Sequence, residues 1–316
     1  MLKCAGRFFV VSDKIRFAKE YKTAKELVSL LQRRGLRVED PAGAERCLST
    51  ISDYRLSAYL YPLLKAPKSG NTYKEGSSFN QAMCLYRFDK ELRLLIFDEI
   101  EKIEIAVRTA IIDECAAAYG NAFWMTDKNN FINAKRYERA LLAIDNELNK
   151  SHEEFIVHFR DKYSDPYPPA WMLAEIIPLG VLTNIFVNID SPKAKKNVAQ
   201  RFGLQLPVFN SWLTTVTLMR NSCCHHSRVW NRHNTINPKY PKRVSAPWVK
   251  LRPDTNRVYF NICIIKYFVD RISSDNNMME KLLRLFSAYP DVDKLAMGFP
   301  GGWMEEPLWR WSAGCQ

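Results

Sequence analysis

The sequence of 316 residues predicts an all-α fold. Apolar residues recur at three- and four-residue steps, as one face of a helix requires, and the clearest stripe contains Leu92, Ile96, Ile100, Ile103 and Val107. Helix-capping residues precede several of the apolar stretches. No segment is clearly predicted as a strand, and the chain has only 12 glycines. These observations together favour a helical bundle over a sheet-containing fold.

Residues 1–77 are expected to form an N-terminal helical extension. Thr23 and Glu26 have the spacing of a capping box, which predicts that a helix begins there. The first 22 residues are basic and weakly patterned, as in a tail or a loosely docked arm. The segment 66–77 is rich in turn-forming residues and marks the boundary with the next domain.

Residues 78–290 are expected to form the main helical bundle. Its longest helix is predicted to begin near Ser78 and to end at Tyr119, before Gly120. Further helices are predicted at about 132–161, 171–189 (kinked at Pro178), 192–203, 207–233, 257–273 and 277–289.

The segment 234–256 contains four prolines among lysines and arginines, which excludes regular secondary structure. A loop of this length is often functional or mobile. We therefore expect a flexible basic flap beside the functional site. Residues 291–316, with Trp303, Trp309 and Trp311, are expected to form a docked C-terminal tail.

Positive charge is concentrated in one part of the sequence. The chain has 46 Lys and Arg against 34 Asp and Glu, a net charge of +12. Residues 220–257 contain nine basic side chains and one acid, Asp254. Such a patch indicates a polyanionic ligand and favours nucleic acid. The alternative is a generally basic protein without such a ligand.

The eight cysteines show no C-x-x-C spacing, and several occupy apolar helical positions, as buried thiols do. The run Cys223-Cys224-His225-His226 does not predict a zinc site, because adjacent helical residues diverge by about 100°. Nucleotide-binding glycine motifs are absent from the sequence. We therefore predict neither a metal nor a cofactor. The cysteine usage suits a reducing cytosol, and no apolar run reaches the roughly 18 residues of a membrane span, so we expect a cytoplasmic protein with no membrane partner.

The stretch from Leu218 to His233 concentrates the polar chemistry, with three histidines, three arginines and two asparagines. His226 is expected on the apolar face of the helix, in a packed supporting role, and His233 at the helix end. On a continuous helix, six side chains would share a sector of about 140° with no carboxylate among them: Arg220, Asn221, His225, Arg228, Asn231 and Arg232.

This polar face is suited to metal-free chemistry on RNA. A neutral imidazole can deprotonate a ribose 2′-hydroxyl, which then attacks the adjacent phosphorus, and arginine can stabilise the charge that develops. We predict His225 as general base or acid, Arg220 as the transition-state clamp and Asn221 as an orienting hydrogen-bonding group. Flanking phosphates would be bound by Arg228, Asn231, Arg232, Lys239, Lys242, Arg243, Lys250 and Arg252. The alternatives are a solvated polar face, a scaffold that binds RNA without cutting it, and a protein-interaction module.

Glu101, Glu104 and Arg108 share a face of the longest predicted helix. They could form a surface ion-pair ladder, or they could face Arg220 and His225 and orient these side chains. The ladder is favoured for Glu101, and both interpretations stay open for Glu104 and Arg108.

The segment Arg220-Asn221-x-x-x-His225 resembles the R-x(4–6)-H signature of HEPN-domain ribonucleases. The longer run that continues to Arg232 is similar to the abortive infection (Abi) family of the AbiD/AbiF type, although Cys224 stands where relatives often have alanine. From about residue 20 to 310, other segments resemble the same family in the same order: I-x-x-Y-R-L-S-x-Y at 51–59, 85–93, E-x-x-E-x-x-x-R at 101–108, P-x-W-M-x-x-E at 169–175 and M-G-F-P at 297–300.

The resemblance implies a HEPN-like helical bundle and a metal-independent endoribonuclease that acts in phage defence. Many HEPN ribonucleases form a composite site across a dimer, so we expect a homodimer. Some Abi relatives are thought to pair with a small noncoding RNA, which makes RNA the expected partner, as a substrate or as a bound antitoxin.

Overall fold

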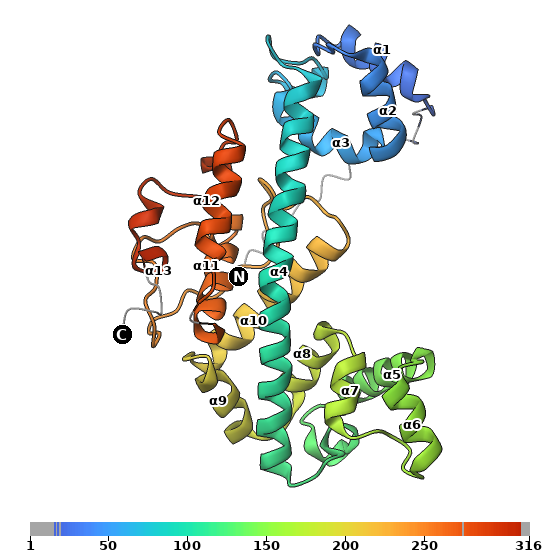
Figure 1. Ribbon diagram of the computed structural model, residues 1–316, viewed down its shortest axis with the longest axis vertical. Coiled ribbons are helices and arrows are strands. Elements are labelled where there is room, and N and C mark those ends of the chain that lie inside the picture. Colours follow the sequence, from blue (N-terminus) through green and yellow to red (C-terminus); the bar gives the residue numbers. More distant parts are fainter. Residues whose placement is uncertain (1–15, 17, 19, 274, 311–316) are drawn as a thin grey trace, which may run out of the picture. The chain divides into compact units, whose positions relative to one another are not determined.

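The computed structural model describes residues 16, 18, 20–273 and 275–310 (Figure 1). Thirteen α-helices and six short 3-10 turns form within these residues, with no strand among them. The all-α prediction is therefore confirmed. The chain divides into two compact units, one ending at Cys84 and the other beginning at Leu85. This division falls inside the long helix α4 (Phe79–Tyr119).

The first unit is a small helical unit in which α1 packs against α2. The capping box predicted at its start is confirmed, because Thr23 Oγ1 accepts a hydrogen bond from the Glu26 N–H at 3.3 Å and Glu26 Oε2 accepts one from the Thr23 N–H at 2.7 Å. The expected N-terminal arm lies mostly outside the described residues. The helices are α1 (Ala24–Arg33), α2 (Pro41–Ile51) and α3 (Asp53–Leu60).

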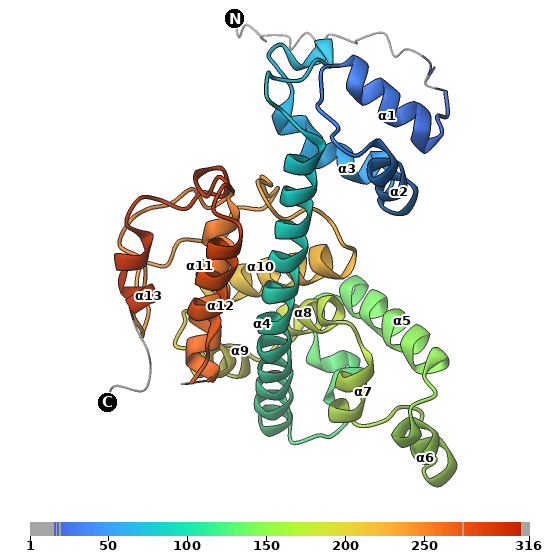
Figure 2. The same cartoon turned by 45° about the horizontal axis from the view of Figure 1, so that its top comes forward.

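The second unit contains the greater part of α4, whose 41 residues confirm the predicted longest helix. Its other helices are α5 (Ala134–Lys150), α6 (Glu154–Lys162), α7 (Ala170–Ile176), α8 (Leu179–Asn188), α9 (Pro192–Arg201), α10 (Leu206–Cys224), α11 (Val258–Ile272), α12 (Met278–Ala288) and α13 (Pro307–Arg310). Helix α10 packs against both α8 and α11 and passes beside α4 (Figure 2).

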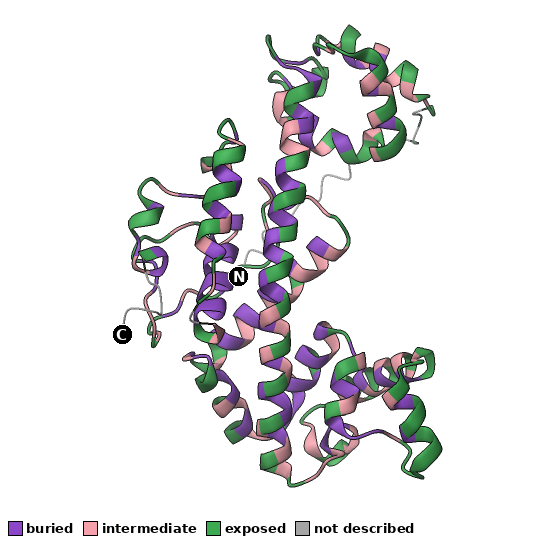
Figure 3. Cartoon of the chain, viewed as in Figure 1, coloured by how far each residue is buried: buried purple, intermediate pink, exposed green. Residues whose placement is uncertain are grey.

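Helix α11 forms the core of this unit. All its residues from Val258 to Asp270 are buried (Figure 3), as expected of a helix that is enclosed on every side. The rings of Phe268 and Trp212 lie edge to face with centroids 6.1 Å apart. This contact fixes α10 against the core, so the position of the motif at the end of α10 is determined by packing.

Two helices that the sequence predicted as continuous are broken. The expected helix 171–189 is divided into α7 and α8 at Ile177 and Pro178. Proline lacks the N–H of the helical ladder and disfavours helical geometry at the residue before it, and Ile177 accordingly has an extended backbone (φ −83°, ψ 142°). The expected helix 132–161 is divided into α5 and α6, with Ser151 extended between them.

The basic segment 234–256 has no helix or strand, as predicted, but the expectation of a flexible flap is wrong. Trp212 Nε1 donates a hydrogen bond to the carbonyl of Lys239 at 2.9 Å. The ring of Trp248 is buried, with its centroid 4.7 Å from that of Trp212. The segment is therefore packed on α10 through its aromatic side chains, while Lys242 and other charged residues stay exposed.

The described part of the C-terminal tail, 291–310, packs on the core. Trp309 Nε1 donates a hydrogen bond to the hydroxyl of Tyr259 at 3.2 Å, and Glu306 Oε2 accepts one from the N–H of Leu251 at 3.1 Å. Trp311, which the sequence placed in the same docked tail, lies outside the described residues. Within the described part of the chain, no helix has both the length and the apolar character needed to cross a membrane.

Candidate functional site

The motif begins on α10, whose apolar face is confirmed as far as Cys223. Trp212, Val216, Met219 and Cys223 are all buried. Burial raises the pKa of the Cys223 thiol to about 12, so this thiol stays protonated at neutral pH and is no nucleophile. The buried face leaves Arg220 and Asn221 on the partly exposed side of the last turns.

Helix α10 ends at Cys224, nine positions before the predicted end at His233. The N–H of Ser227 donates to the carbonyl of Ser222 at 2.9 Å and that of His226 to Cys223 at 3.0 Å. These are the two hydrogen bonds of a Schellman motif, which ends helices with one left-handed residue. That residue is His226, with φ +54°. The prediction that His226 packs on the apolar face is therefore wrong, and its side chain is exposed.

The predicted sector of six polar residues is therefore not one helical face. Arg220 and Asn221 lie on α10, and the exposed His225 is its C-cap residue. The other three belong to the loop that follows: Arg228, Asn231 and Arg232.

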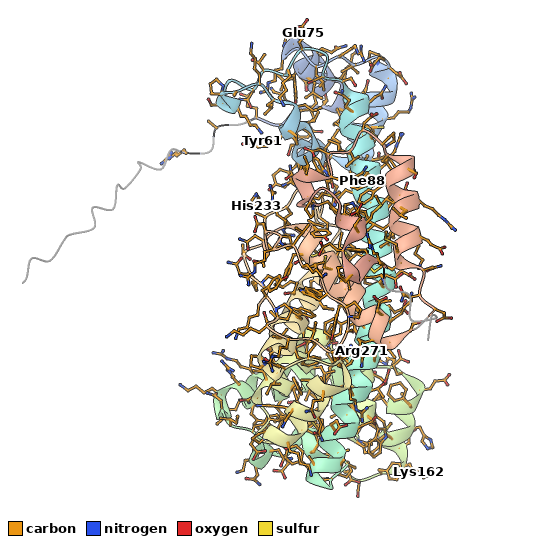
Figure 4. The ribbon with its side chains drawn as sticks, turned by 90° about the vertical axis from the view of Figure 1, so that its left-hand side faces the viewer. Tyr61, Glu75, Phe88, Lys162, His233 and Arg271 are labelled. Carbon is orange, nitrogen blue, oxygen red and sulfur yellow. The ribbon has the colours of Figure 1, made fainter. Side chains whose placement is uncertain are left out.

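Asn231 and Arg232 make hydrogen bonds that hold the loop in place. Asn231, with φ +49°, accepts a hydrogen bond from Arg257 Nη1 at 3.1 Å through Oδ1. Arg232 Nη1 donates to Ser222 Oγ at 3.1 Å. His233, predicted at the helix end, is instead an exposed residue of this loop (Figure 4).

A buried carboxylate on α4 holds the loop in place. Asp89 Oδ1 accepts hydrogen bonds from the backbone N–H groups of Val229 at 3.0 Å and Trp230 at 2.6 Å. Asp89 also forms an ion pair with Arg93, one turn along the helix, and both side chains are buried. The sequence interpretation gave these two residues no role, although they belong to the family-like segment 85–93.

Arg220 lies beside Glu104, so a carboxylate from α4 faces the polar residues of α10, which include no carboxylate of their own. Arg220 Nε lies 3.5 Å from Glu104 Oε2, and it is buried without a hydrogen-bond partner. Arg108 also pairs with Glu104 and donates to the carbonyls of Ala174 and Ile177, the latter at 2.9 Å. Of the two interpretations left open for Glu104 and Arg108, the geometry favours orientation of Arg220.

These side chains line an open pocket of about 540 Å³. It contains three carboxylates and two guanidinium groups, because Glu101 and Glu175 join the three residues just described. Phe97 and Ile105 supply exposed apolar surface beside them. The Arg220 side chain is 31% exposed, which leaves it accessible to a ligand from this pocket.

His225 and Arg220 lie at the same end of α10 but are not bonded to each other. They are five positions apart, or about 7.5 Å along the helix axis. Neither side chain forms a hydrogen bond with the other among the described residues. The C-terminal end of α10 thus presents an accessible imidazole at its C-cap and, about one and a half turns earlier, a guanidinium paired with Glu104.

The basic segment is only partly associated with this end of α10. The N–H of Lys239 donates to Ser211 Oγ at 2.9 Å, and Ser211 lies about 14 Å along the helix from Arg220. The guanidinium of Arg252 lies 5.6 Å from the ring centroid of Tyr240. The segment contacts α10 at Ser211 and Trp212. The structure does not gather its exposed cations around Arg220: Lys239, Lys242, Arg243, Lys250 and Arg252.

No group of three or more His, Cys, Asp or Glu side chains able to hold a metal ion occurs in the part of the chain that the structure describes. Cys223 and Cys224, which the sequence excluded as joint zinc ligands, differ in environment, since Cys223 is buried and Cys224 is half-buried.

A comparison with protein families matches residues 46–231 of this chain to the Abi-like protein family. The matched region is more than half of the chain and contains α4, α10 and the residues from Arg220 to Asn231. The chain therefore belongs to the Abi-like protein family. This membership supports a role in abortive infection, a defence against phage. No curated protein and no solved structure matches the chain.

Proposed function

We propose that this Abi-like protein is a HEPN-type, metal-independent endoribonuclease whose reacting groups are Arg220 and His225. The observation that carries the proposal is the end of α10. There a guanidinium held by Glu104 faces an open pocket, and an exposed imidazole caps the same helix. These are the two kinds of group that phosphodiester cleavage by a ribose hydroxyl requires.

The reaction would use the nucleophile that RNA carries. His225 accepts the proton of a 2′-hydroxyl, the 2′-oxygen bonds to the adjacent phosphorus, and the bond from phosphorus to the 5′-oxygen breaks. The products are a 2′,3′-cyclic phosphate and a 5′-hydroxyl. The leaving oxygen needs a proton from an acid, and a second His225 from another copy of the chain would supply it in a homodimer.

Arg220 would stabilise the negative charge on the phosphorane. Glu104 orients the Arg220 guanidinium, and Arg108 holds Glu104 through an ion pair that is itself anchored on two backbone carbonyls. Groups held in this way need little reorganisation when charge develops. Asn221, which follows Arg220 on α10 and is partly exposed, would orient the scissile phosphate.

The cations outside the pocket would bind the rest of the RNA. The three carboxylates of the pocket repel phosphates, so the rest of the strand would lie outside it. Flanking phosphates would contact Arg228 and Arg232 in the loop and the exposed cations of the basic segment, as predicted from the sequence. The same surface would hold a small noncoding RNA that keeps the enzyme inactive.

The test compares an all-ribose oligonucleotide with the same sequence carrying 2′-deoxyribose throughout, in EDTA. We expect the protein to cut only the ribose form and to leave cyclic phosphate ends. His225→Ala should reduce the rate by about 10²- to 10⁴-fold, the usual contribution of a general base or acid. The matched control is His158→Ala, which removes an exposed histidine from α6.

Cleavage of the deoxyribose strand, or unchanged cleavage by His225→Ala, would contradict this mechanism. Tight RNA binding without any cleavage would favour the scaffold that uses the same basic surface. Absence of RNA binding altogether would favour a protein-interaction module.

A further inference from the structure

A second, smaller cavity lies on the other side of α10. Leu218 and Ser222 line it, and at 100° per residue both lie about 160° around the helix from Arg220. The loop after the helix and α11 close the cavity. The complete lining is Thr215, Leu218, Met219, Ser222, Arg232, Asn234, Thr235, Ile236 and Asn261.

Two buried amide atoms in this lining lack a partner. Asn261 is 1% exposed, and its Nδ2 donates to Met219 Sδ at 3.3 Å, but its Oδ1 accepts no hydrogen bond. The Nδ2 of Asn234 is likewise buried and donates to nothing among the described residues. Buried polar groups are normally satisfied, so one unused acceptor and one unused donor indicate an occupant that offers the complementary pair.

The cavity is small and has both apolar and polar walls. Its volume is about 60 Å³, enough for roughly four to six water molecules, each of which needs about 10–15 Å³. Met219 and Ile236 supply apolar walls. Leu218 and Ile236 are 41% and 36% exposed, so the cavity opens to solvent. Apolar walls with a few placed polar atoms are typical of ligand sites.

Arg232 gives the cavity a charged edge. One guanidinium nitrogen, Nη1, donates to Ser222 Oγ, while the remaining donors of the planar fork make no hydrogen bond within the described residues. An arginine fork binds phosphate oxygens well. A ligand with a ring for the cavity and a phosphate for its edge would be a nucleotide.

We infer that this cavity binds a single unstacked nucleobase of an RNA strand, with Asn234 and Asn261 on the edge of the base and Arg232 on its phosphate. Proteins read single-stranded RNA in this way, through splayed bases that present their hydrogen-bonding edges. The inference rests on the proposed function only in that RNA is the ligand. It adds a subsite that gives sequence preference at a fixed position from the Arg220 pocket.

The experiment measures binding of fluorescent hexamers with 2′-fluoro ribose, which cannot be cut because the nucleophile is missing. The hexamers are homopolymers of A, C or U, and an abasic hexamer reports phosphate contacts alone. We expect the wild-type protein to bind at least one homopolymer about tenfold more tightly than the abasic hexamer. Asn234→Ala should remove this preference without weakening binding of the abasic hexamer.

Two further variants keep the test decisive. Asn237→Ala, on an exposed asparagine of the same loop outside the cavity, should keep the preference. Ile236→Trp should fill the cavity from its open side. It should abolish the preference while the amide groups of Asn234 and Asn261 stay unchanged. Thermal unfolding of each variant verifies the fold.

Equal binding of all hexamers by the wild-type protein, or a preference that survives both Asn234→Ala and Ile236→Trp, would overturn the inference and leave the cavity to water. If the wild-type protein cuts no RNA but shows a base preference that these variants lose, the base site is supported and the nuclease is rejected. If the protein cuts RNA but shows no base preference, the nuclease is supported and the base site is rejected. Absence of binding to any hexamer would overturn the inference.

Discussion

The carboxylate of Asp89 and the backbone N–H of Trp230 are joined by a hydrogen bond of 2.6 Å across 141 positions of sequence. Through this contact α4 determines where the chain goes after α10 ends. The loop that carries Arg228, Asn231 and Arg232 is therefore attached to the same long helix that carries Glu104 and Arg108. The residues proposed to act on RNA share one support.

The substitution Asp89→Asn tests whether this carboxylate holds the loop, and the measured quantity is the free energy of unfolding. The substitution removes the charge that pairs with the buried Arg93 and weakens the acceptor for two N–H groups. Leaving one member of a buried ion pair alone costs about 3–5 kcal/mol. We expect urea denaturation to show a loss of this size. Asp98→Asn, which alters a side chain that is 51% exposed, should cost far less, and equal losses in the two variants would contradict the assignment.

Glu104→Gln tests the orientation of Arg220. Glutamine keeps the shape of the side chain and removes the charge that faces Arg220 Nε and Arg108. We expect the rate of RNA cleavage to fall roughly 10- to 100-fold, because small misplacements of a catalytic group have effects of this size, while RNA affinity changes little. The control is Glu101→Gln on the same pocket, whose side chain is exposed. Equal effects of both variants on the rate would indicate general electrostatics instead.

The basic segment should determine the salt dependence of RNA binding. Replacing Lys239, Lys242 and Arg243 together by glutamine should reduce the slope of log affinity against log salt by about 2, at roughly 0.7 per phosphate contact on a single strand. The matched control is the triple replacement of exposed residues on α5: Lys135, Arg136 and Arg139. An unchanged slope in the first variant would show that its charge is incidental to RNA binding.

Trp248→Ala tests whether aromatic packing holds the basic segment. Loss of a buried tryptophan costs about 3–5 kcal/mol, and here it also removes the ring beside Trp212. We expect brief trypsin treatment to cut the variant at Lys242 and Arg243 much faster than the wild type. Trp171→Ala, at a tryptophan that is 50% exposed, should leave these sites protected. Rapid cutting of the wild-type protein at the same sites would instead support the flexible flap that the sequence predicted.

Cys223 should resist alkylation until the protein unfolds. Burial raises its pKa to about 12, so its thiolate fraction at pH 8 is about one in ten thousand. The half-buried Cys224 should react with iodoacetamide first. Peptide mapping by mass spectrometry distinguishes the neighbours, because Cys223→Ser should leave the early labelling unchanged and Cys224→Ser should remove it. Early modification of Cys223 would show that the end of α10 opens readily.

Local signals in the sequence predicted most of the helices. The capping box at Thr23 and the apolar stripe of α4 were sufficient, because both depend on residues three or four positions apart. The end of α10 was missed because His226 occupies the left-handed position that glycine usually marks. The break at Pro178 was predicted only as a kink, since proline alone does not indicate whether a helix resumes in the same direction.

The site required contacts that no local pattern contains. Glu104 precedes Arg220 by more than a hundred positions, and the sequence left its orientation open until α4 and α10 were seen to pass side by side. Prolines and charges in 234–256 indicated mobility. The docking of Trp248, however, depends on the ring of Trp212, which lies in α10 and far away in the sequence. The unpartnered amide atoms of Asn234 and Asn261 become apparent only when a hydrogen-bond partner is sought for every buried polar atom of the folded chain.

The left-handed backbone of His226 affects how alanine scanning of this motif should be interpreted. Any non-glycine residue with φ of +54° carries conformational strain of about 1–2 kcal/mol, so His226→Ala removes an imidazole and retains the strain. His226→Gly removes both and suits the turn better. Comparison of alanine and glycine at this one position therefore separates what the ring contributes to RNA from what the turn contributes to folding.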